Sequence, residues 1–565
     1  MLDGDTLAAF NIIGNFSACF YDGALLKVIP EQLFAMYTVD WMFNLYCAQF
    51  GGIGHLRKVL SVYRQHGGGE WSNRQEWDKA TTLNRLCDEY NAFLNFQFNN
   101  GWQQYKKSLL GWMAYAHAER TKKFDLIILD DVFPAPVSGF RYAEFTAILR
   151  AFPKALALVS GSTLPFLGEE SLAVLVRKYQ LRYPELGTRI MDSAGFSPVR
   201  SSKLLYVNFL VNAYALLPVA EEVGVPFAFT LYPGGGFGFN NPDCDSKLRR
   251  VFASPCFRRV IVTQQVTYDY LVNNGLCPQD RIALIFGVVM PPEAFREPIP
   301  QDKLRWGYGK QRLDICFMAH RYTPRGEDKG YDVFVNAAAQ LSSLHPDIDF
   351  HVVGPYDRFV VNVGPAGNRI TYHGVLKPDQ LDEFFRGMDI VISPNISGKL
   401  WPGSFDGFPT ASCTEGGLRG VVIFCTDEFG AAAGRFDAGR DFVLLKYDLE
   451  HIVRTISDYH GKPDALKAIG ERGSRRIMDL YGEEAQIEPR IRILRELIES
   501  PFAFDAQKLQ SLPPCSGEAA ANPLNVTVIP QPSPLWSWLK RYSPQPLKSF
   551  YRKHVKKYVG PRYGY

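Results

Sequence analysis

The chain has 565 residues, of which 46% are hydrophobic and 21% charged, a composition typical of a globular protein with more than one domain. Its net charge of +4 is small for this length and argues against a nucleic-acid partner. No run of about 18 apolar residues predicts a membrane span, and the opening MLDGDTLAAFNIIG lacks the basic start and apolar core of a signal peptide.

The ten cysteines are scattered, and no two of them have C-x-x-C spacing. Cys316, Cys413 and Cys425 lie in apolar runs. Reduced thiols in a cytoplasmic compartment therefore fit better than a disulfide framework or a zinc site. We expect no metal and no other cofactor.

Residues 1–75 are predicted to form a helix, a turn, a strand and a second turn, with Asp40 and Trp41 opening the helix. One interpretation is a structural cap, in which Asp40 caps the helix and His66 lies in a turn. The segments WMFNLYCAQFGGIG and VYRQH also resemble the C-terminal end of family 2 glycosyltransferases of the GT-A type. That resemblance implies that Asp40 is an acceptor-activating base and that His66 lies near the donor phosphates.

Nothing before this segment supplies the nucleotide-binding strands or the Asp-x-Asp metal site of that family. The segment is then either the end of a truncated two-enzyme chain or a relic. In-frame coding sequence upstream of Met1 is the expected finding if the chain is truncated. Residues 76–123 are predicted to be connecting helices without a motif.

Residues 124–295 alternate strands and helices, which predicts a doubly wound parallel sheet with ligands at the C-terminal strand ends. Predicted strands lie at 124–132, 155–161, 226–232, 258–263 and 281–289, with a further strand and helix within 204–223. Three loops follow such strands: one at Asp130 and Asp131, one at Tyr232 with Gly234–Gly236, and one at Thr263–Gln265.

The successive glycines Gly234, Gly235 and Gly236 let the backbone approach a ligand closely and expose its N–H groups. They do not form G-x-G-x-x-G, so a dinucleotide site is not supported. The alternative is a flexible surface loop. Asp130 and Asp131 are candidates for binding acceptor hydroxyls. Adjacent residues of a strand point to opposite faces, so a metal shared by these two acids is not expected.

Residues 139–144 either contact the acceptor or cap a helix with a surface ion pair between Arg141 and Glu144. Residues 296–311 are rich in proline and polar residues, which favours an interdomain linker. Residues 312–500 then repeat the alternation, with strands near 313–319, 348–354, 370–376, 389–395 and 421–424. One helix is predicted over 450–482 and another over 484–499.

The stretch from Ser404 to Asp427 carries the strongest local signal. A turn of Asp406, Gly407, Phe408 and Pro409 precedes a short helix, with Thr410 predicted as its N-cap and Glu415 inside it. The unpaired N–H groups and the dipole of a helix N-terminus favour an anion, and an acid on the helix can accept sugar hydroxyls. The alternative is an ordinary βαβ turn with a solvated glutamate.

Over residues 124–500 the chain resembles the retaining family 4 glycosyltransferases of the GT-B class. The resemblance is carried by Arg321 and Lys329-Gly330 after the first strand of the second domain, by Ser393-Pro394, and by the acid-Gly-Phe-Pro turn followed by Glu415. Two features depart from the family. The acid pair is Asp406 and Glu415 with eight residues between them rather than two glutamates with seven, and Tyr232 stands where many relatives have a histidine.

The resemblance implies transfer of a sugar from a nucleotide diphosphate to an acceptor hydroxyl, with retention at the anomeric carbon. Arg321, Lys329 and the helix start at Thr410 would stabilise the leaving diphosphate, and Glu415 would accept from the ribose hydroxyls. Asp406 would position the donor sugar. The other implied donor contacts are Ser393, Gly407, Phe408, Pro409 and Gly234–Gly236. The implied acceptor contacts are Asp130, Asp131 and Tyr232.

After a proline-rich linker from residue 501, residues 535–565 combine eight lysines and arginines with interleaved aromatic residues and no acid. This pattern favours a peripheral contact with anionic lipid, where a lipid-linked glycan acceptor would be found. A docking tail for another subunit and plain disorder are the alternatives.

We therefore predict an α/β protein of GT-B architecture, with two Rossmann-like domains facing across a cleft, a mostly helical N-terminal extension and a basic C-terminal tail. The predicted function is a glycosyltransferase of bacterial surface polysaccharide or glycan synthesis, cytoplasmic or on the inner face of the membrane. The alternatives are a GT-B sugar-nucleotide epimerase, a glucan synthase, and a non-catalytic nucleotide-sugar-binding module.

Overall fold

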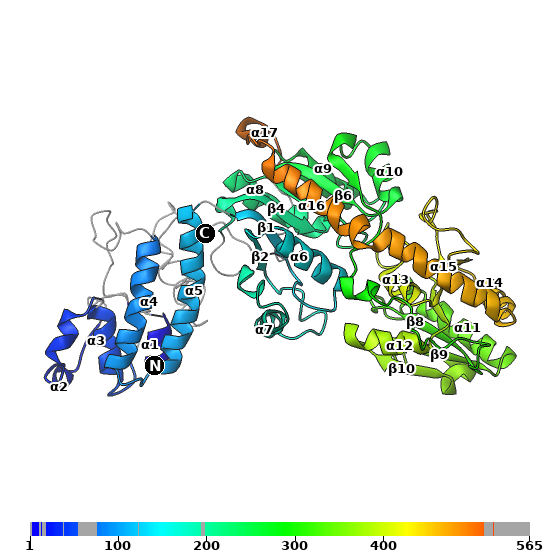
Figure 1. Ribbon diagram of the computed structural model, residues 1–565. Helices are drawn as coiled ribbons and strands as arrows, with labels where there is room; N and C mark the ends of the chain where they lie inside the picture. Colours follow the sequence, from blue (N-terminus) through cyan, green and yellow to red (C-terminus); the bar gives the residue numbers. More distant parts are fainter. Residues whose placement is uncertain are drawn as a thin grey trace. The chain divides into compact units, whose positions relative to one another are not determined.

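A computed structural model describes residues 3–10, 13, 19–37, 39–54, 76–121, 124–193, 198–513 and 524. The chain divides into two units, one comprising the N-terminal part up to residue 123 and the other residues 124–194 and 202–526. The second unit contains two parallel β-sheets flanked by helices (Figure 1). The α/β class with a mostly helical N-terminal region is confirmed.

The N-terminal unit is built from helices around an aromatic core. Its helices are α1 (Gly4–Phe10), α2 (Gly23–Leu26), α3 (Val39–Ala48), α4 (Glu76–Phe93) and α5 (Asn99–Thr121). Trp41 of α3 packs 5.0 Å from Trp102 of α5, and its indole N–H donates to the Leu7 carbonyl at 3.0 Å. The segment before residue 75 and the connecting helices thus share one core.

Asp40 lies in the first turn of α3 rather than at its N-cap, because the helix begins at Val39. Its carboxylate accepts the N–H of Trp41 at 2.9 Å, and burial raises its pKa. His66, the strand expected over residues 59–65 and the basic tail 535–565 lie outside the described residues.

The first domain of the second unit has a seven-stranded parallel sheet in the order β3-β2-β1-β4-β5-β6-β7. The apolar runs predicted from the sequence form its central strands, which are buried because helices cover the sheet. The strands are β1 (Phe124–Asp130), β2 (Ala155–Val159), β3 (Ile190–Asp192), β4 (Ser202–Asn208), β5 (Phe227–Leu231), β6 (Phe257–Val262) and β7 (Ile282–Leu284). The helices are α6 (Gly139–Ala151), α7 (Leu172–Arg182), α8 (Leu210–Val223), α9 (Pro242–Ala253) and α10 (Gln265–Asn273).

The second domain has a six-stranded parallel sheet in the order β10-β9-β8-β11-β12-β13. Its strands are β8 (Leu313–Met318), β9 (Ile348–Val353), β10 (Ile370–Gly374), β11 (Ile390–Ser393), β12 (Val422–Thr426) and β13 (Val443–Leu445). Its helices are α11 (Tyr331–Leu344), α12 (Leu381–Gly387), α13 (Ala411–Leu418), α14 (Leu449–His460) and α15 (Pro463–Tyr481).

The single helix expected over residues 450–482 is two helices. Gly461 follows α14 as its C-cap, and Pro463 is the first residue of α15. Proline has no N–H to continue the bonding ladder of α14, but it fits the first turn of a new helix.

The last long helix, α16 (Glu483–Glu499), returns to the first domain, where Leu494 and Leu497 join its hydrophobic core (Figure 1). The two sheets are therefore linked twice, by residues 296–311 and by the turn from α15 into α16. A short helix, α17 (Ala506–Gln510), follows in the stretch expected to be a linker.

No described helix combines the length and apolar character needed to cross a bilayer. The nine cysteines within the described residues are all free thiols, as the sequence predicts.

Candidate active site

The site lies at the C-terminal strand ends of the second sheet, where the strand order reverses between β8 and β11. These two strands pair directly, with Val391 opposite Cys316. Loops that leave adjacent strands in opposite directions open a crevice at this point of a parallel sheet. The topology therefore brings Arg321, in the loop after β8, to the same edge of the sheet as Ser393, the last residue of β11.

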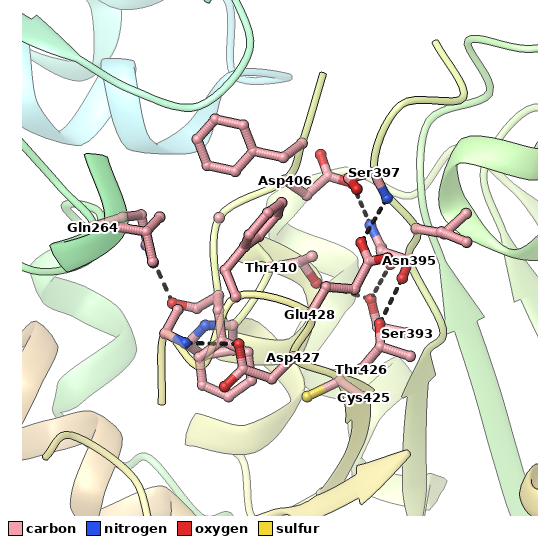
Figure 2. A pocket seen from close by; sticks show the side chains of 18 residues that line it. Gln264, Ser393, Asn395, Ser397, Asp406, Thr410, Cys425, Thr426, Asp427 and Glu428 are labelled. Carbon is pink, nitrogen blue, oxygen red and sulfur yellow. Dashed lines mark hydrogen bonds between the residues drawn. The ribbon is translucent and has the colours of Figure 1, made fainter. Parts of the chain in front are cut away.

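A pocket lies beside this crevice, among the segments that follow β11 and β12 (Figure 2). Most of its lining residues lie within three segments of the second domain, 393–397, 405–410 and 425–431, and Gln264 and Val266 of the first domain add to the lining. The predicted donor contacts that line the pocket are Ser393, Asp406, Gly407, Phe408, Pro409 and Thr410. The two domains thus build the pocket together.

Lys329, which precedes α11, is held against the pocket by Asp406. Its ammonium Nζ lies 2.6 and 2.7 Å from the two carboxylate oxygens of Asp406, and 3.7 Å from Asp328. Burial by itself disfavours the ammonium, but the attraction of Asp406 outweighs it and raises the pKa of Lys329. The lysine is a fixed cation at one side of the pocket.

Asn395 ties the loop after β11 to the same carboxylate. Its side-chain amide donates to Asp406 Oδ2, and its amide oxygen accepts from the Ser393 hydroxyl at 2.6 Å (Figure 2). Ser393 also lies 3.2 Å from the Thr410 hydroxyl. One hydrogen-bonded chain therefore runs from Lys329 to the start of α13.

Thr410 occupies the N-cap position of α13, as predicted, but its side chain does not cap the helix. Its hydroxyl bonds instead to Ser393 and, at 3.1 Å, to Ser412. The first turn of α13 consequently receives no hydrogen-bond acceptor from the Thr410 side chain, which suits a site for an anionic ligand.

The acids after β12 line the same pocket and were not among the sequence candidates. The carboxylate of Asp427 accepts the N–H groups of Ala431 and Ala432 at 2.8 and 2.9 Å. Glu428 accepts the N–H of Ser397 at 2.6 Å. The sequence did contain a signal for these two acids, because they follow the predicted strand 421–424. In a parallel sheet the C-terminal ends of all strands lie at the same edge, where ligands bind.

Gln264 contributes an acceptor without a partner. Its side chain is 3% exposed, and its amide nitrogen donates to the Phe408 carbonyl at 3.2 Å (Figure 2). Within the described residues, its amide oxygen has no hydrogen-bond partner. A buried, unpaired acceptor in a pocket wall is costly, and a ligand hydroxyl would remove that cost.

Three predicted catalytic residues, Arg321, Lys329 and Glu415, are not among the residues that line the pocket. The exposed guanidinium of Arg321 donates to the Pro324 carbonyl at 3.1 Å. Glu415, inside α13, accepts a charge-assisted hydrogen bond from Arg419 at 2.6 Å. Arg419, one helical turn after Glu415, also forms an ion pair with Asp382 of α12. This network of two acids and one arginine holds the Glu415 carboxylate in one orientation.

In the first domain, the two acids after β1 meet at one cation instead of pointing apart. Arg141 Nη1 lies 3.1 Å from Asp130 and 2.7 Å from Asp131. The expected opposite orientation is wrong because β1 ends at Asp130 and the alternation ends with it. Asp130 also accepts the N–H groups of Val132 and Phe133.

Asp131 is bound by Thr163 at 2.6 Å and by Asn212 at 3.0 Å. Burial opposes its ionisation, but Arg141 and these hydrogen bonds together lower its pKa. Burial raises the pKa of Asp130. Both carboxylates are engaged within the protein, so neither is presented to an acceptor as it stands.

Tyr232 and Glu144 belong to a buried network rather than to a surface. Glu144 is fully buried and accepts from Tyr232 at 2.7 Å and from Tyr206. Arg490 of α16, also fully buried, lies 3.8 Å from Glu144. The surface ion pair expected for Glu144 is wrong, because α16 covers this part of α6 and supplies the counter-charge.

The triple glycine turns the chain toward the second domain. All three residues have positive φ, and a Cβ on Gly235 would lie 2.2 Å from the Phe209 side chain. Just beyond it, the N–H of Phe239 donates to the Gly403 carbonyl at 2.8 Å, and its ring stacks 4.1 Å from Phe405. Within the described chain, Gly234–Gly236 are not among the residues that line the pocket.

Residues 332–487 match the sequence profile of a family described as glycosyl transferase-like. No curated protein sequence matches the chain.

Solved structures with similar chains include sucrose-phosphate synthase from Thermosynechococcus elongatus, with 14% identity, coverage of 66% of this chain and 99% of that one, and a TM-score of 0.46. A glycosyltransferase from Rickettsia africae has 17% identity, coverage of 66% and 98%, and a TM-score of 0.44. Anabaena HepE in complex with UDP-glucose has 13% identity, coverage of 68% and 100%, and a TM-score of 0.47.

The two parallel sheets, with a pocket lined by both domains, are the arrangement that the sequence predicts for a GT-B architecture. The matched profile covers part of the second domain. The matched residues extend from α11 to the start of α16 and include Asp406 and α13.

Proposed function

We propose that the chain transfers a sugar from a nucleotide-diphosphate donor to an acceptor hydroxyl, with retention at the anomeric carbon. The observation that carries the proposal is the fixed ammonium of Lys329, bound by Asp406 beside a pocket that ends at the start of α13. A cation and a helix N-terminus on one pocket are suited to a diphosphate.

In this proposal Lys329, Arg321 and the first turn of α13 stabilise the charge that develops on the leaving diphosphate. Fixed charges in a partly buried site do this without the reorganisation that water would need. Lys329 exchanges part of its pairing with Asp406 for a phosphate oxygen. The exposed Arg321 is free to turn from the Pro324 carbonyl toward the same group.

Asp406, Asn395 and the amide oxygen of Gln264 are the proposed contacts to the donor sugar, with backbone groups of Gly407–Thr410. Glu415 is the proposed acceptor for the ribose hydroxyls, and its bond to Arg419 holds the carboxylate in one orientation. Because Gln264 belongs to the first domain, its contact would couple donor binding to closure of the two domains.

Retention, and a role in bacterial surface polysaccharide or glycan synthesis, rest on the resemblance of the motif residues to family 4 glycosyltransferases. The basic, aromatic segment 535–565 supports a lipid-linked acceptor at an anionic membrane. Salt-sensitive binding of the full chain to phosphatidylserine vesicles, lost when 535–565 is deleted, is the expected result. Equal binding by the shortened chain would remove the membrane proposal.

The proposed activity is tested by a screen of nucleotide-diphosphate sugars for hydrolysis and for transfer, beginning with UDP-glucose. We expect a signal with one donor that is lost in Glu415→Ala and kept in Glu383→Ala, an exposed acid of α12. The anomeric configuration of the product, measured by NMR, tests retention. Donor binding without turnover would instead indicate a non-catalytic binding module.

A further inference from the structure

Three potential metal ligands meet at the other end of the second domain, away from the proposed donor pocket. His345 follows α11, Asp347 precedes β9, and His460 is the last residue of α14. The donor pocket lies at the C-terminal ends of the strands, whereas Asp347 lies at the N-terminal end of β9. A strand of six residues spans roughly 20 Å, so the cluster is separate from the donor chemistry.

The ligand atoms are close enough to share one ion. One atom from each of His345, Asp347 and His460 lies within 4.8 Å of the other two. His460 Nε2 is 3.0 Å from both carboxylate oxygens of Asp347. Ligand atoms of a tetrahedral zinc ion with bonds of about 2.1 Å lie about 3.4 Å apart, so only small side-chain movements are needed.

Neighbouring residues hold the two imidazoles in place. The His460 ring packs between the His345 ring at 4.4 Å and the Trp306 indole at 5.0 Å. His345 Nε2 bonds to the Ser457 hydroxyl at 2.9 Å. A hydrogen bond from one ring nitrogen to an oxygen partner is the usual outer support of a metal-binding histidine, and it leaves the other nitrogen for the ion.

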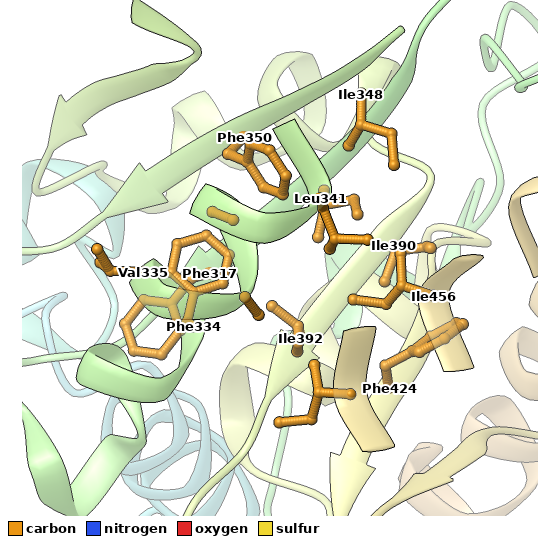
Figure 3. Close-up of a cluster of buried hydrophobic side chains, with 14 of the residues drawn as sticks. Phe317, Phe334, Val335, Leu341, Ile348, Phe350, Ile390, Ile392, Phe424 and Ile456 are labelled. Atoms are coloured by element: carbon orange, nitrogen blue, oxygen red, sulfur yellow. The ribbon is translucent and has the colours of Figure 1, made fainter. Parts of the chain in front are cut away.

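The backbone beneath the cluster is rigid. Leu341, Ile348 and Ile456, which lie close in sequence to the three ligands, all belong to the buried core of the domain (Figure 3). The guanidinium of Arg369 donates to the carbonyls of Pro346 and Ile348, so it fixes the turn that carries His345 and Asp347.

We propose that His345, Asp347 and His460 bind a divalent transition metal of the zinc class. Two imidazole nitrogens and one carboxylate suit zinc better than magnesium or calcium, and three protein ligands leave a position for water. The ion would join the ends of α11 and α14 to the start of β9, and would stabilise the fold of the second domain rather than take part in sugar transfer.

To test the proposal, the full chain is first treated with a chelator and then titrated with zinc. Binding is measured by calorimetry and by the rise in melting temperature that zinc causes. Cobalt provides a visible spectrum of the same site. We expect loss of a ligand in His345→Ala, His460→Ala or the nearly isosteric Asp347→Asn to weaken zinc binding about 100-fold or more, since even outer partners cost 10–100-fold.

His351→Ala is the matched control. His351 is another half-buried histidine of the same sheet that pairs with an aspartate, its Nε2 lying 2.7 Å from Asp314. Its removal should leave zinc affinity unchanged. Equal affinity in the three ligand variants, or no zinc binding by the parent chain, would overturn the proposal. Should the variants fail to fold, anomalous scattering at the zinc edge from crystals of the parent chain decides. A peak beside His460 supports the site, and peaks only elsewhere refute it.

Discussion

The ammonium of Lys329 lies 2.6 Å from the carboxylate of Asp406, a residue 77 positions later in the chain. The pair joins the loop after β8 to the loop before α13, across the switch point of the sheet. It also explains why a lysine so deeply placed remains charged, since Asp406 outweighs the effect of burial on its pKa. The first two predictions follow from this pair.

Lys329→Ala should cost roughly 3 kcal/mol or more of transition-state stabilisation, as expected for loss of a fixed charge at a leaving group. The measurement is kcat/KM with the donor found in the screen. Lys377→Ala, which removes an exposed lysine of the same domain, should be close to wild type. Turnover of Lys329→Ala near that of Lys377→Ala would show that the lysine has no such role.

Asp406→Asn should make activity more sensitive to alkaline pH, and it should remove the alkaline loss of stability that the pair causes. The raised pKa of Lys329 means that the pair stabilises the fold below the unfolded lysine pKa of about 10.4, and that this contribution disappears as pH rises through the folded pKa. Without the carboxylate, burial lowers that pKa, so the alkaline limb of the pH–rate profile should move to lower pH. An unshifted limb would mean that Asp406 does not set the charge of Lys329.

Gln264→Leu should weaken donor binding with little loss of stability. The substitution removes an unpaired buried oxygen, which costs nothing in the free protein, together with one hydrogen bond to the Phe408 carbonyl. If the oxygen accepts a donor hydroxyl, donor KM should rise about tenfold, the equivalent of about 1.4 kcal/mol. The neighbouring Gln265→Leu, at an exposed position, is the control. The same KM in both variants would exclude the contact.

Gly403→Ala should disturb the contact between the domains. The residue has a φ of +83°, and a Cβ there would lie 2.0 Å from the Phe239 carbonyl oxygen. Gly434→Ala is matched in backbone strain, with a φ of +69°, but its Cβ meets nothing within 4 Å. Both should lose roughly 1–2 kcal/mol from strain. Only Gly403→Ala should also raise the donor KM. Equal KM values in the two variants would show that the contact between Gly403 and Phe239 does not affect donor binding.

The two-sheet architecture was predictable because its signals are local. Short apolar runs such as 124–129 and 421–424 alternate with helical patterns, and a parallel sheet follows from that alternation. The turn at Asp406–Pro409 and the short helix after it were likewise predicted from residue types alone. The break of the 450–482 helix at Gly461 was missed, although Pro463 was a visible signal for it.

The site was predictable only in part. Ser393, Asp406 and Thr410, which the sequence places at and after one strand, line one pocket, and their role in donor binding stays a prediction. Asp130 and Asp131 pair with Arg141, and Tyr232 with Arg490, and local residue patterns do not reveal these partners. Their contact with an acceptor stays a prediction. Asp427, Glu428 and Gln264 lie at strand ends too, but nothing local distinguishes a strand-end residue in the pocket from one outside it.

By itself, then, the sequence determined the central strands of residues 124–500, the parallel character of both sheets and the helix start at Thr410, because these depend on residue types a few positions apart. Tertiary structure alone decided that Asp406 neutralises Lys329, that α16 returns to supply Arg490 to Glu144, and that Gln264 faces the pocket of the other domain. These pairs are separated by 77 to more than 300 residues. Their contacts form only when helices and strands pack, so side-chain burial and charge at the site are properties of the packed fold.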